Sequence, residues 1–91
     1  MTEFAEEMIG YAGGFLSSIS FLPQVIKIWK TKSAEDLSML TLVFLTCNMS
    51  LWLTYGILKE ATPIWLTNAI LLLMVSCMIY FKIIFKKKRY E

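Results

Sequence analysis

The sequence contains no histidine and only two cysteines, and this scarcity excludes several kinds of site. Cys47 and Cys77 lie far apart in the chain, whereas zinc sites and disulfide frameworks need clustered ligands. We therefore expect no metal and no cofactor, and we interpret both cysteines as small apolar packing residues. The chain also lacks a nucleophile–base set and a glycine-rich phosphate loop, so we do not expect an enzyme.

Charged residues are missing from most of the chain. Only 18% of the 91 residues are charged and 57% are hydrophobic, whereas a soluble domain has about 25% charged residues. Three stretches contain no Asp, Glu, Lys or Arg: Met8–Ile26, Leu37–Leu58 and Ala61–Phe81. Each reaches the ~20 residues that cross a bilayer. We predict an all-α membrane protein, one transmembrane domain over residues 1–91, with helices over about 8–29, 38–58 and 63–85.

The basic residues gather on one side of the three predicted helices. The opposite side has only Lys59. Because cytoplasmic segments carry the excess of Lys and Arg, we expect a cytoplasmic C-terminus and an outside N-terminus. The net charge is only +2, so we expect the bilayer as a partner and no nucleic acid. The residues on the basic side are Lys27, Lys30, Lys32, Lys82, Lys86, Lys87, Lys88 and Arg89.

A proline interrupts the first predicted helix in its cytoplasmic half. Pro23 has no backbone N–H, so it cannot donate to the carbonyl of Ile19. Such breaks are tolerated in membranes and often mark moving parts. We predict a hinge at Pro23 and Gln24, with the Gln24 amide available to backbone groups that a bend exposes.

Small residues line the first half of the same helix. Gly10 and Gly14 form a G-x-x-x-G pattern that Ser17 continues at helical spacing. Such a face lets a second helix approach closely. The pattern leaves open whether that neighbour belongs to the same subunit or to another one.

Polar groups recur on one face of the second predicted helix. Asn48, Trp52 and Tyr55 share this face, and Lys59 extends it outward. Packing between helices would explain Asn48, but an indole near the middle of a span is better explained if it lines a path. The third predicted helix adds Asn68 near its start.

An aromatic ring beside amide groups suits a sugar. The C–H face of a pyranose stacks on an indole, and its hydroxyl groups need both donors and acceptors. We therefore predict that Trp52 and Asn68 bind substrate, with Asn48 and Ser20 as further candidates.

The predicted spans contain no ionisable Asp, Glu, His or Arg. Ion-coupled carriers usually place such a relay at that depth, so its absence favours downhill movement of a neutral solute. Three helices cannot enclose a path, whereas six can. We expect two copies to pair in the same orientation, as in transporters with parallel repeats.

Several stretches together resemble a bacterial SemiSWEET sugar transporter, the half-size relative of the SWEETs in the PQ-loop superfamily. The resemblance spans nearly the whole chain, from about Gly10 to Phe85. It implies a triple-helix bundle with spatial order 1-3-2, assembled as a parallel homodimer. It also implies facilitated diffusion of a mono- or disaccharide of the glucose or sucrose class across the bacterial inner membrane, by alternating access. The matching stretches are Phe21–Gln24, Val25–Lys27, Thr31–Ser38, Leu51–Leu58 and Asn68.

The resemblance assigns roles to individual residues. Trp52 and Asn68 correspond to the sugar-binding pair, and Pro23 with Gln24 to the hinge of the inner gate. Tyr55 matches an outer-gate aromatic residue.

The outer gate departs from the family pattern at one position. Lys59 stands where relatives carry a basic gate residue, but its acidic partner two positions later is Ala61 here. Glu60 is the neighbouring acid and a further gate candidate. Two other functions stay open: a small PQ-loop interaction or receptor protein, and a carrier of another small neutral solute.

Overall fold

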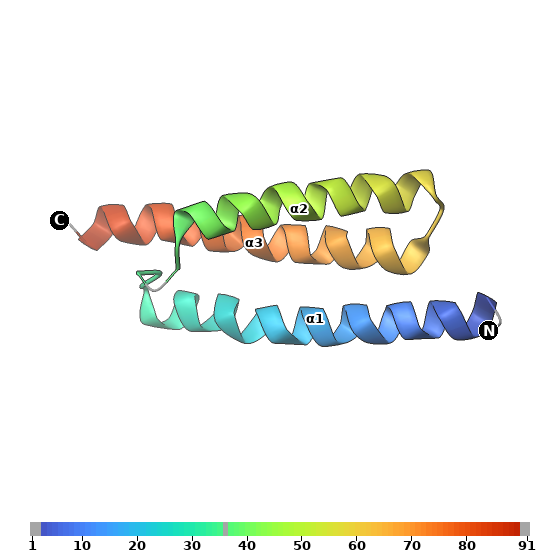
Figure 1. Cartoon of the computed structure of the whole chain (residues 1–91). Helices are drawn as coiled ribbons and strands as arrows, with labels where there is room; N and C mark the ends of the chain where they lie inside the picture. Colours follow the sequence, from blue (N-terminus) through green and yellow to red (C-terminus); the bar gives the residue numbers. More distant parts are fainter. Residues whose placement is uncertain (1–2, 36, 90–91) are drawn as a thin grey trace.

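The computed structural model describes residues 3–35 and 37–89, with side chains as far as Phe85, and these residues form three long α-helices (Figure 1). They are α1 (Glu3–Thr31), α2 (Met39–Leu58) and α3 (Thr62–Arg89). α1 begins earlier than the charge-free stretch because Glu3 and Glu6 lie in its first turn, where carboxylates interact favourably with the helix dipole. α3 likewise continues beyond its apolar part.

All three helices are long and apolar enough to cross a membrane by length and composition, over Glu3–Thr31, Met39–Leu58 and Thr62–Phe85. Many large apolar side chains remain exposed on the single chain, including Leu51 and Leu58 on α2. Exposed apolar surface of this extent needs lipid or another protein against it. The all-α membrane fold is confirmed.

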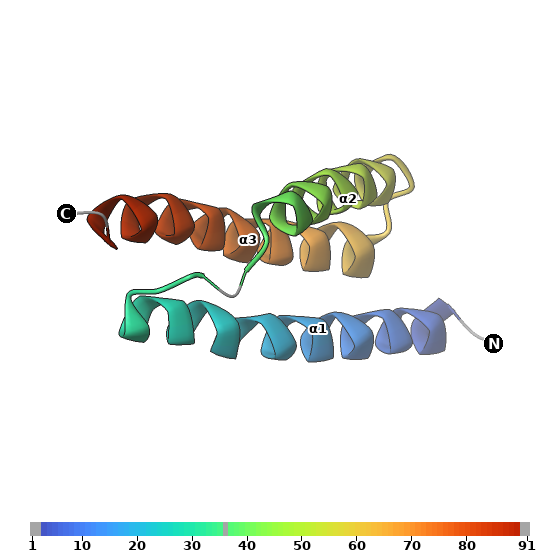
Figure 2. The same ribbon diagram turned by 60° about the vertical axis from the view of Figure 1, so that its left-hand side comes forward.

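α3 lies between the other two helices. It packs against both α1 and α2, whereas α1 and α2 do not pack against each other within the described part of the chain. Figures 1 and 2 show the same order from two directions. Val75 and Met78 of α3 are almost completely buried in the resulting core. The predicted spatial order 1-3-2 is therefore confirmed.

Two glycines let α1 approach α3 closely. A Cβ atom on Gly10 would lie 2.8 Å from Cβ of Pro63, and one on Gly14 would meet the Thr67 side chain. Gly13, by contrast, has nothing within 4 Å of a built Cβ. The contacts of Gly10 and Gly14 are thus made with α3 of the same subunit, which answers the question that the sequence pattern left open.

The contacts between the α1 segment and α3 have the same sequence offset near the start of α1 and just beyond its end. Gly10 and Gly14 meet Pro63 and Thr67, and beyond the end of α1 the Lys32 ammonium lies 5.5 Å from the Phe85 ring centroid. Every one of these pairs is separated by 53 positions in the sequence. α1 and α3 therefore run parallel, and the contacting pairs near the start of α1 and just beyond its end have the same offset.

The link between α1 and α2 is attached to α3. Lys82 Nζ donates a hydrogen bond to the carbonyl oxygen of Ala34 at 3.0 Å, and Ala34 is buried. Lys32 adopts a positive φ of 57° and places its ammonium 4.6 Å from the Trp29 ring centroid. These contacts fix the link over the last turns of α3.

The link between α2 and α3 is a tight turn. Ala61 N–H donates to the carbonyl of Gly56 at 2.8 Å, and Glu60 adopts a positive φ of 51°. A Cβ on Gly56 would lie 2.7 Å from the backbone nitrogen of Trp65. Only glycine fits at this approach of α2 to α3, so Gly56 fixes how the two antiparallel helices meet.

Candidate functional site

The aromatic residues of the predicted site lie together on α2. The rings of Trp52 and Tyr55 are edge to face, with centroids 5.5 Å apart and an interplanar angle of 85°. Their exposed fractions are 48% and 47%, so the protomer covers only half of each ring. This edge-to-face geometry is a favourable one for aromatic pairs, and it leaves indole surface open to a ligand.

Asn48 and Lys59 continue the same face of α2, and both are exposed. The face flanks the contact with α3, because it lies about a quarter of a turn around the helix from Leu42, Met49 and Gly56, the buried residues of α2. An amide and an indole exposed on a membrane helix require a polar or protein neighbour.

Asn68 lies on α3 and is half-buried. Its Nδ2 donates to the carbonyl of Ile64 at 2.8 Å. This bond uses one of the two N–H donors of the amide, and an amide oxygen can in addition accept. Asn68 therefore keeps both donor and acceptor capacity for a ligand.

The helix contacts put Trp52 and Asn68 at the same depth. Gly56 of α2 lies against Ile64 and Trp65 of α3, and the two helices are antiparallel (Figure 1). Trp52 lies one helical turn before Gly56 on α2, and Asn68 lies one helical turn after Ile64 on α3. The close approach at Gly56 therefore brings the two predicted ligands level, although the ring contact of Trp52 is with Tyr55.

The hinge candidates Pro23 and Gln24 lie closer to the C-terminal end of α1 than the level of Trp52 and Asn68. α1 continues as an α-helix through Pro23. From the register of α1 and α3, Asn68 is level with Phe15, so Pro23 lies eight residues further along, or about 12 Å at 1.5 Å per residue. The proline is thus outside the level of the predicted ligand pair.

Gln24 and Ser20 hydrogen-bond to their own helix. Gln24 Nε2 donates to the carbonyl of Ser20 at 3.3 Å, and Ser20 Oγ donates to the carbonyl of Leu16 at 2.9 Å. Pro23 leaves the carbonyl of Ile19 without its helical donor. The Gln24 side chain hydrogen-bonds to the neighbouring carbonyl, that of Ser20, and not to Ile19. Both residues are exposed, on the face of α1 that also carries Ser17.

The outer-gate candidates surround the turn between α2 and α3. Lys59 caps α2, with its N–H donating to the carbonyl of Tyr55 at 3.0 Å. Lys59 and Glu60 are both exposed, and the described residues show no ion pair between them. A hollow of about 470 Å³ adjoins this turn, lined by Ile57, Glu60, Thr62 and Trp65. No pattern in the sequence of this stretch indicates the hollow.

α2 also carries a series of hydroxyl groups that was not among the predicted site residues. Thr46, Ser50 and Thr54 each donate to the carbonyl four residues earlier, at 2.9, 2.7 and 2.9 Å. Their regular four-residue spacing was the available signal. Such bonds satisfy hydroxyl groups inside a membrane and can bend a helix slightly.

No cluster of three or more His, Cys, Asp or Glu that could hold a metal ion occurs in the described part of the chain. The candidate site is therefore a set of aromatic, amide and hydroxyl groups on membrane helices, half-covered in the single protomer.

Comparison with known proteins agrees with this architecture. The PQ loop repeat family matches residues 5–65. A protein named Sugar transporter SemiSWEET from Leptospira biflexa is 38% identical, over 86% of this chain and 92% of its own length. Another protein of that name from Bradyrhizobium diazoefficiens is 31% identical, over 91% of this chain and 96% of its own length.

A solved structure shows the same fold. It is titled "Crystal structure of a bacterial homologue of SWEET transporters" and matches with a TM-score of 0.85 at 34% identity, over 89% of this chain and 98% of its own. The chain therefore belongs to the PQ-loop family and, within it, to the SemiSWEET proteins.

Proposed function

We propose that this chain is a facilitative transporter that moves a mono- or disaccharide across the bacterial inner membrane. The observation that carries the proposal is Trp52, an indole that is half-exposed within a membrane helix and level with Asn68. The indole face stacks on the C–H face of a pyranose, and the amide pairs with its hydroxyl groups. The names of the SemiSWEET relatives support sugar as the solute.

Transport is downhill in this proposal. The charge-free stretches of the sequence supply no Asp, Glu, His or Arg for an ion or proton relay. A neutral sugar needs no counter-charge in the site. The solute therefore follows its own concentration gradient, without coupling to an ion.

The working unit is a parallel homodimer. The stripe formed by Asn48, Trp52 and Tyr55 is exposed beside the contact with α3, and α1 presents Ser20 and Gln24 on an exposed face. A second copy in the same orientation would cover both faces and place Trp52 and Asn68 twice around one central cavity. Asn48 and Ser20 would then contact solute beside them.

Alternating access needs a gate at each end. Pro23 and Gln24 act as the inner hinge, because a proline removes one helical hydrogen bond and lowers the cost of bending. Tyr55 and Lys59 act at the outer end, with Glu60 as the nearest acid. With Ala61 at the usual acidic position, aromatic packing at Tyr55 closes this gate more than an ion pair does.

Two alternative functions, a receptor or assembly protein and a carrier of another neutral solute, can be distinguished from sugar transport by an uptake assay. A receptor or assembly protein has no need of an open indole at the level of Asn68. A carrier of another neutral solute would use the same cavity.

The test is uptake into liposomes. Purified protein should equilibrate labelled glucose or sucrose in the absence of any ion gradient. Failure with a panel of sugars, while another neutral solute equilibrates, would assign the carrier alternative. Failure with every solute would assign the receptor or assembly function.

A further inference from the structure

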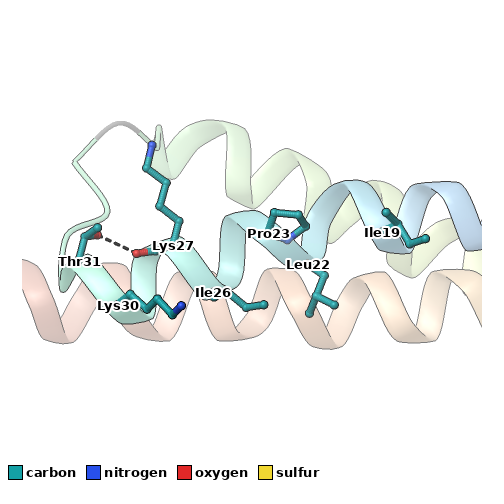
Figure 3. A pocket seen from close by; sticks show the side chains of 7 residues that line it. All are labelled: Ile19, Leu22, Pro23, Ile26, Lys27, Lys30 and Thr31. Atoms are coloured by element: carbon teal, nitrogen blue, oxygen red, sulfur yellow. Dashed lines mark hydrogen bonds between the residues drawn. The ribbon is translucent and has the colours of Figure 1, made fainter.

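One face of α1 has a hollow that does not belong to the proposed sugar path. It has a volume of about 510 Å³ and is lined by Ile19, Leu22, Pro23, Ile26, Lys27, Lys30 and Thr31 (Figure 3). Four of its lining residues are apolar, and two lysines stand at one end. The volume is in the range of small-molecule sites, about 300–1,000 Å³.

This face differs from the other two faces of α1. Phe21, Val25 and Ile28 pack into the core against α3. Ser20 and Gln24 occupy the polar face. The hollow residues recur at three- and four-residue spacing and therefore share a third face, which is left uncovered by the protomer.

The two lysines at the hollow have unpaired charges. Two other lysines at this end have described side chains, and both make contacts: Lys32 with the Trp29 and Phe85 rings, and Lys82 with the carbonyl of Ala34. Among the described residues, neither the Lys27 nor the Lys30 ammonium has a hydrogen bond or ion pair. Figure 3 shows their side chains diverging to either side of the apolar groove.

We propose that this groove binds an anionic phospholipid. An acyl chain would lie along Ile19, Leu22 and Ile26, beside the notch at Pro23. The phosphate would lie between Lys27 and Lys30, about one turn beyond the apolar part. An apolar groove that ends in two free cations is complementary to a lipid with a negative headgroup. None of the described residues that line the groove is acidic.

Because Pro23 lines the groove, a bound lipid would affect the bending of α1 at this residue. The groove spans both sides of this residue, from Ile19 to Lys30. A lipid along it contacts α1 above and below the proposed hinge, and therefore favours one bend angle of α1. Anionic lipid thus regulates the lower half of α1 from outside the sugar path.

Native mass spectrometry of the detergent-purified protein tests the proposal. The protein is titrated with phosphatidylglycerol and, separately, with phosphatidylcholine of the same acyl chains. We expect one tightly bound phosphatidylglycerol per chain and much weaker phosphatidylcholine. Each lysine near an anionic headgroup contributes about fivefold in affinity, so K27Q/K30Q should weaken phosphatidylglycerol about 25-fold. Equal binding of the two lipids, or unchanged binding to K27Q/K30Q, would overturn the proposal.

Two matched variants separate the site from general attraction. K59Q removes the same charge as K30Q at the opposite end of the bundle, so K59Q should retain wild-type phosphatidylglycerol affinity. Ile26→Trp keeps both lysines but fills the groove, and should weaken binding at least tenfold. An equal loss in K59Q and K30Q, or none in Ile26→Trp, would show that the groove does not bind lipid.

A cross-linking experiment tests the competing occupant, a second copy of the chain. Ile26→Cys is introduced into a background with Cys47→Ala and Cys77→Ala and oxidised in membranes. We expect no disulfide-linked dimer through Ile26→Cys, because lipid covers this face. An efficient cross-link would assign the groove to the contact between copies and overturn the lipid proposal.

Discussion

Lys82 donates a hydrogen bond to the backbone carbonyl of Ala34 across 48 residues of sequence, at 3.0 Å. The same carbonyl accepts from the Leu37 N–H at 3.2 Å. Together with the Lys32 ammonium near Phe85, this bond ties the α1–α2 link to α3. Any movement of the lower end of α1 must therefore either carry the end of α3 with it or break these contacts.

Replacing Lys82 by methionine should destabilise the protein. Methionine keeps most of the side chain but lacks the ammonium, so the Ala34 carbonyl loses a hydrogen bond from a charged donor, which costs about 1.5–3 kcal/mol. Thermal unfolding in detergent measures the effect. Lys59→Met, at an exposed lysine without such a bond, is the control and should unfold like the wild type; an equal loss in both would contradict this role of Lys82.

Gly14→Ala should weaken the contact of α1 with α3. Its Cβ would meet the Thr67 side chain, and overpacking of this kind costs about 1–3 kcal/mol. Gly13→Ala is the matched control, since nothing lies within 4 Å of its Cβ. It should be neutral or stabilising by up to about 1 kcal/mol, because alanine has the higher helix propensity. Equal melting temperatures of the two variants would contradict the close approach.

Trp52→Ala and Asn68→Ala should each reduce sugar uptake into liposomes below a tenth of the wild-type rate. Loss of stacking on one aromatic side chain, or of a hydrogen-bonded amide, costs about 1–3 kcal/mol per site, and a homodimer carries each site twice. Gel filtration in detergent checks that the assembly survives. Uptake at the wild-type rate in both variants would refute the assignment of the ligand pair.

Pro23→Ala should leave sugar affinity nearly unchanged and slow transport several-fold. Pro23 lies about 12 Å from the level of Asn68, so it does not touch the solute, but alanine restores the helical bond to Ile19 and stiffens α1. Equilibrium binding and initial uptake rates measured side by side separate the two effects. A normal rate would show that the proline has a structural role alone.

Glu60→Gly should stabilise the turn between α2 and α3 by about 1 kcal/mol. Glu60 has a positive φ of 51°, a conformation that costs a residue with a Cβ about 1–2 kcal/mol. Lys32 has the same conformation, with φ of 57°, but its ammonium also contacts two rings. Lys32→Gly should therefore gain less or lose stability, and thermal unfolding of the two variants distinguishes them.

The fold was largely predictable because charge-free stretches and polar links alternate so regularly. Three helices and their membrane character follow from this pattern alone. The spatial order 1-3-2 came from the family resemblance, since hydropathy does not specify which helix lies in the middle. The structure supplies the physical cause: Gly10 and Gly14 fit α3 on one side, and Gly56 fits it on the other.

The roles of the candidate site residues stay predictions, and the sequence pattern indicated which residues share a face but not how the helices bring them together. Helical spacing placed Asn48, Trp52 and Tyr55 on one face of α2, and this face is exposed. The common level of Trp52 and Asn68 depends on the contact at Gly56, which periodicity within one helix does not reveal. The roles of Lys82 and of the groove on α1 likewise depend on contacts between distant segments or on surface shape.

The constant separation of 53 positions between α1 and α3 limits how such a chain can change in evolution. One residue inserted into α1 between Gly14 and Pro23 would turn everything after it by about 100°. Pro23 and Gln24 would rotate with it, and Ile28 would leave the core. Only a matching insertion in α3 would restore the pairing of Lys32 with Phe85. Length variation is therefore expected at the two ends of the chain, while insertions and deletions in α1 and α3 must occur in pairs.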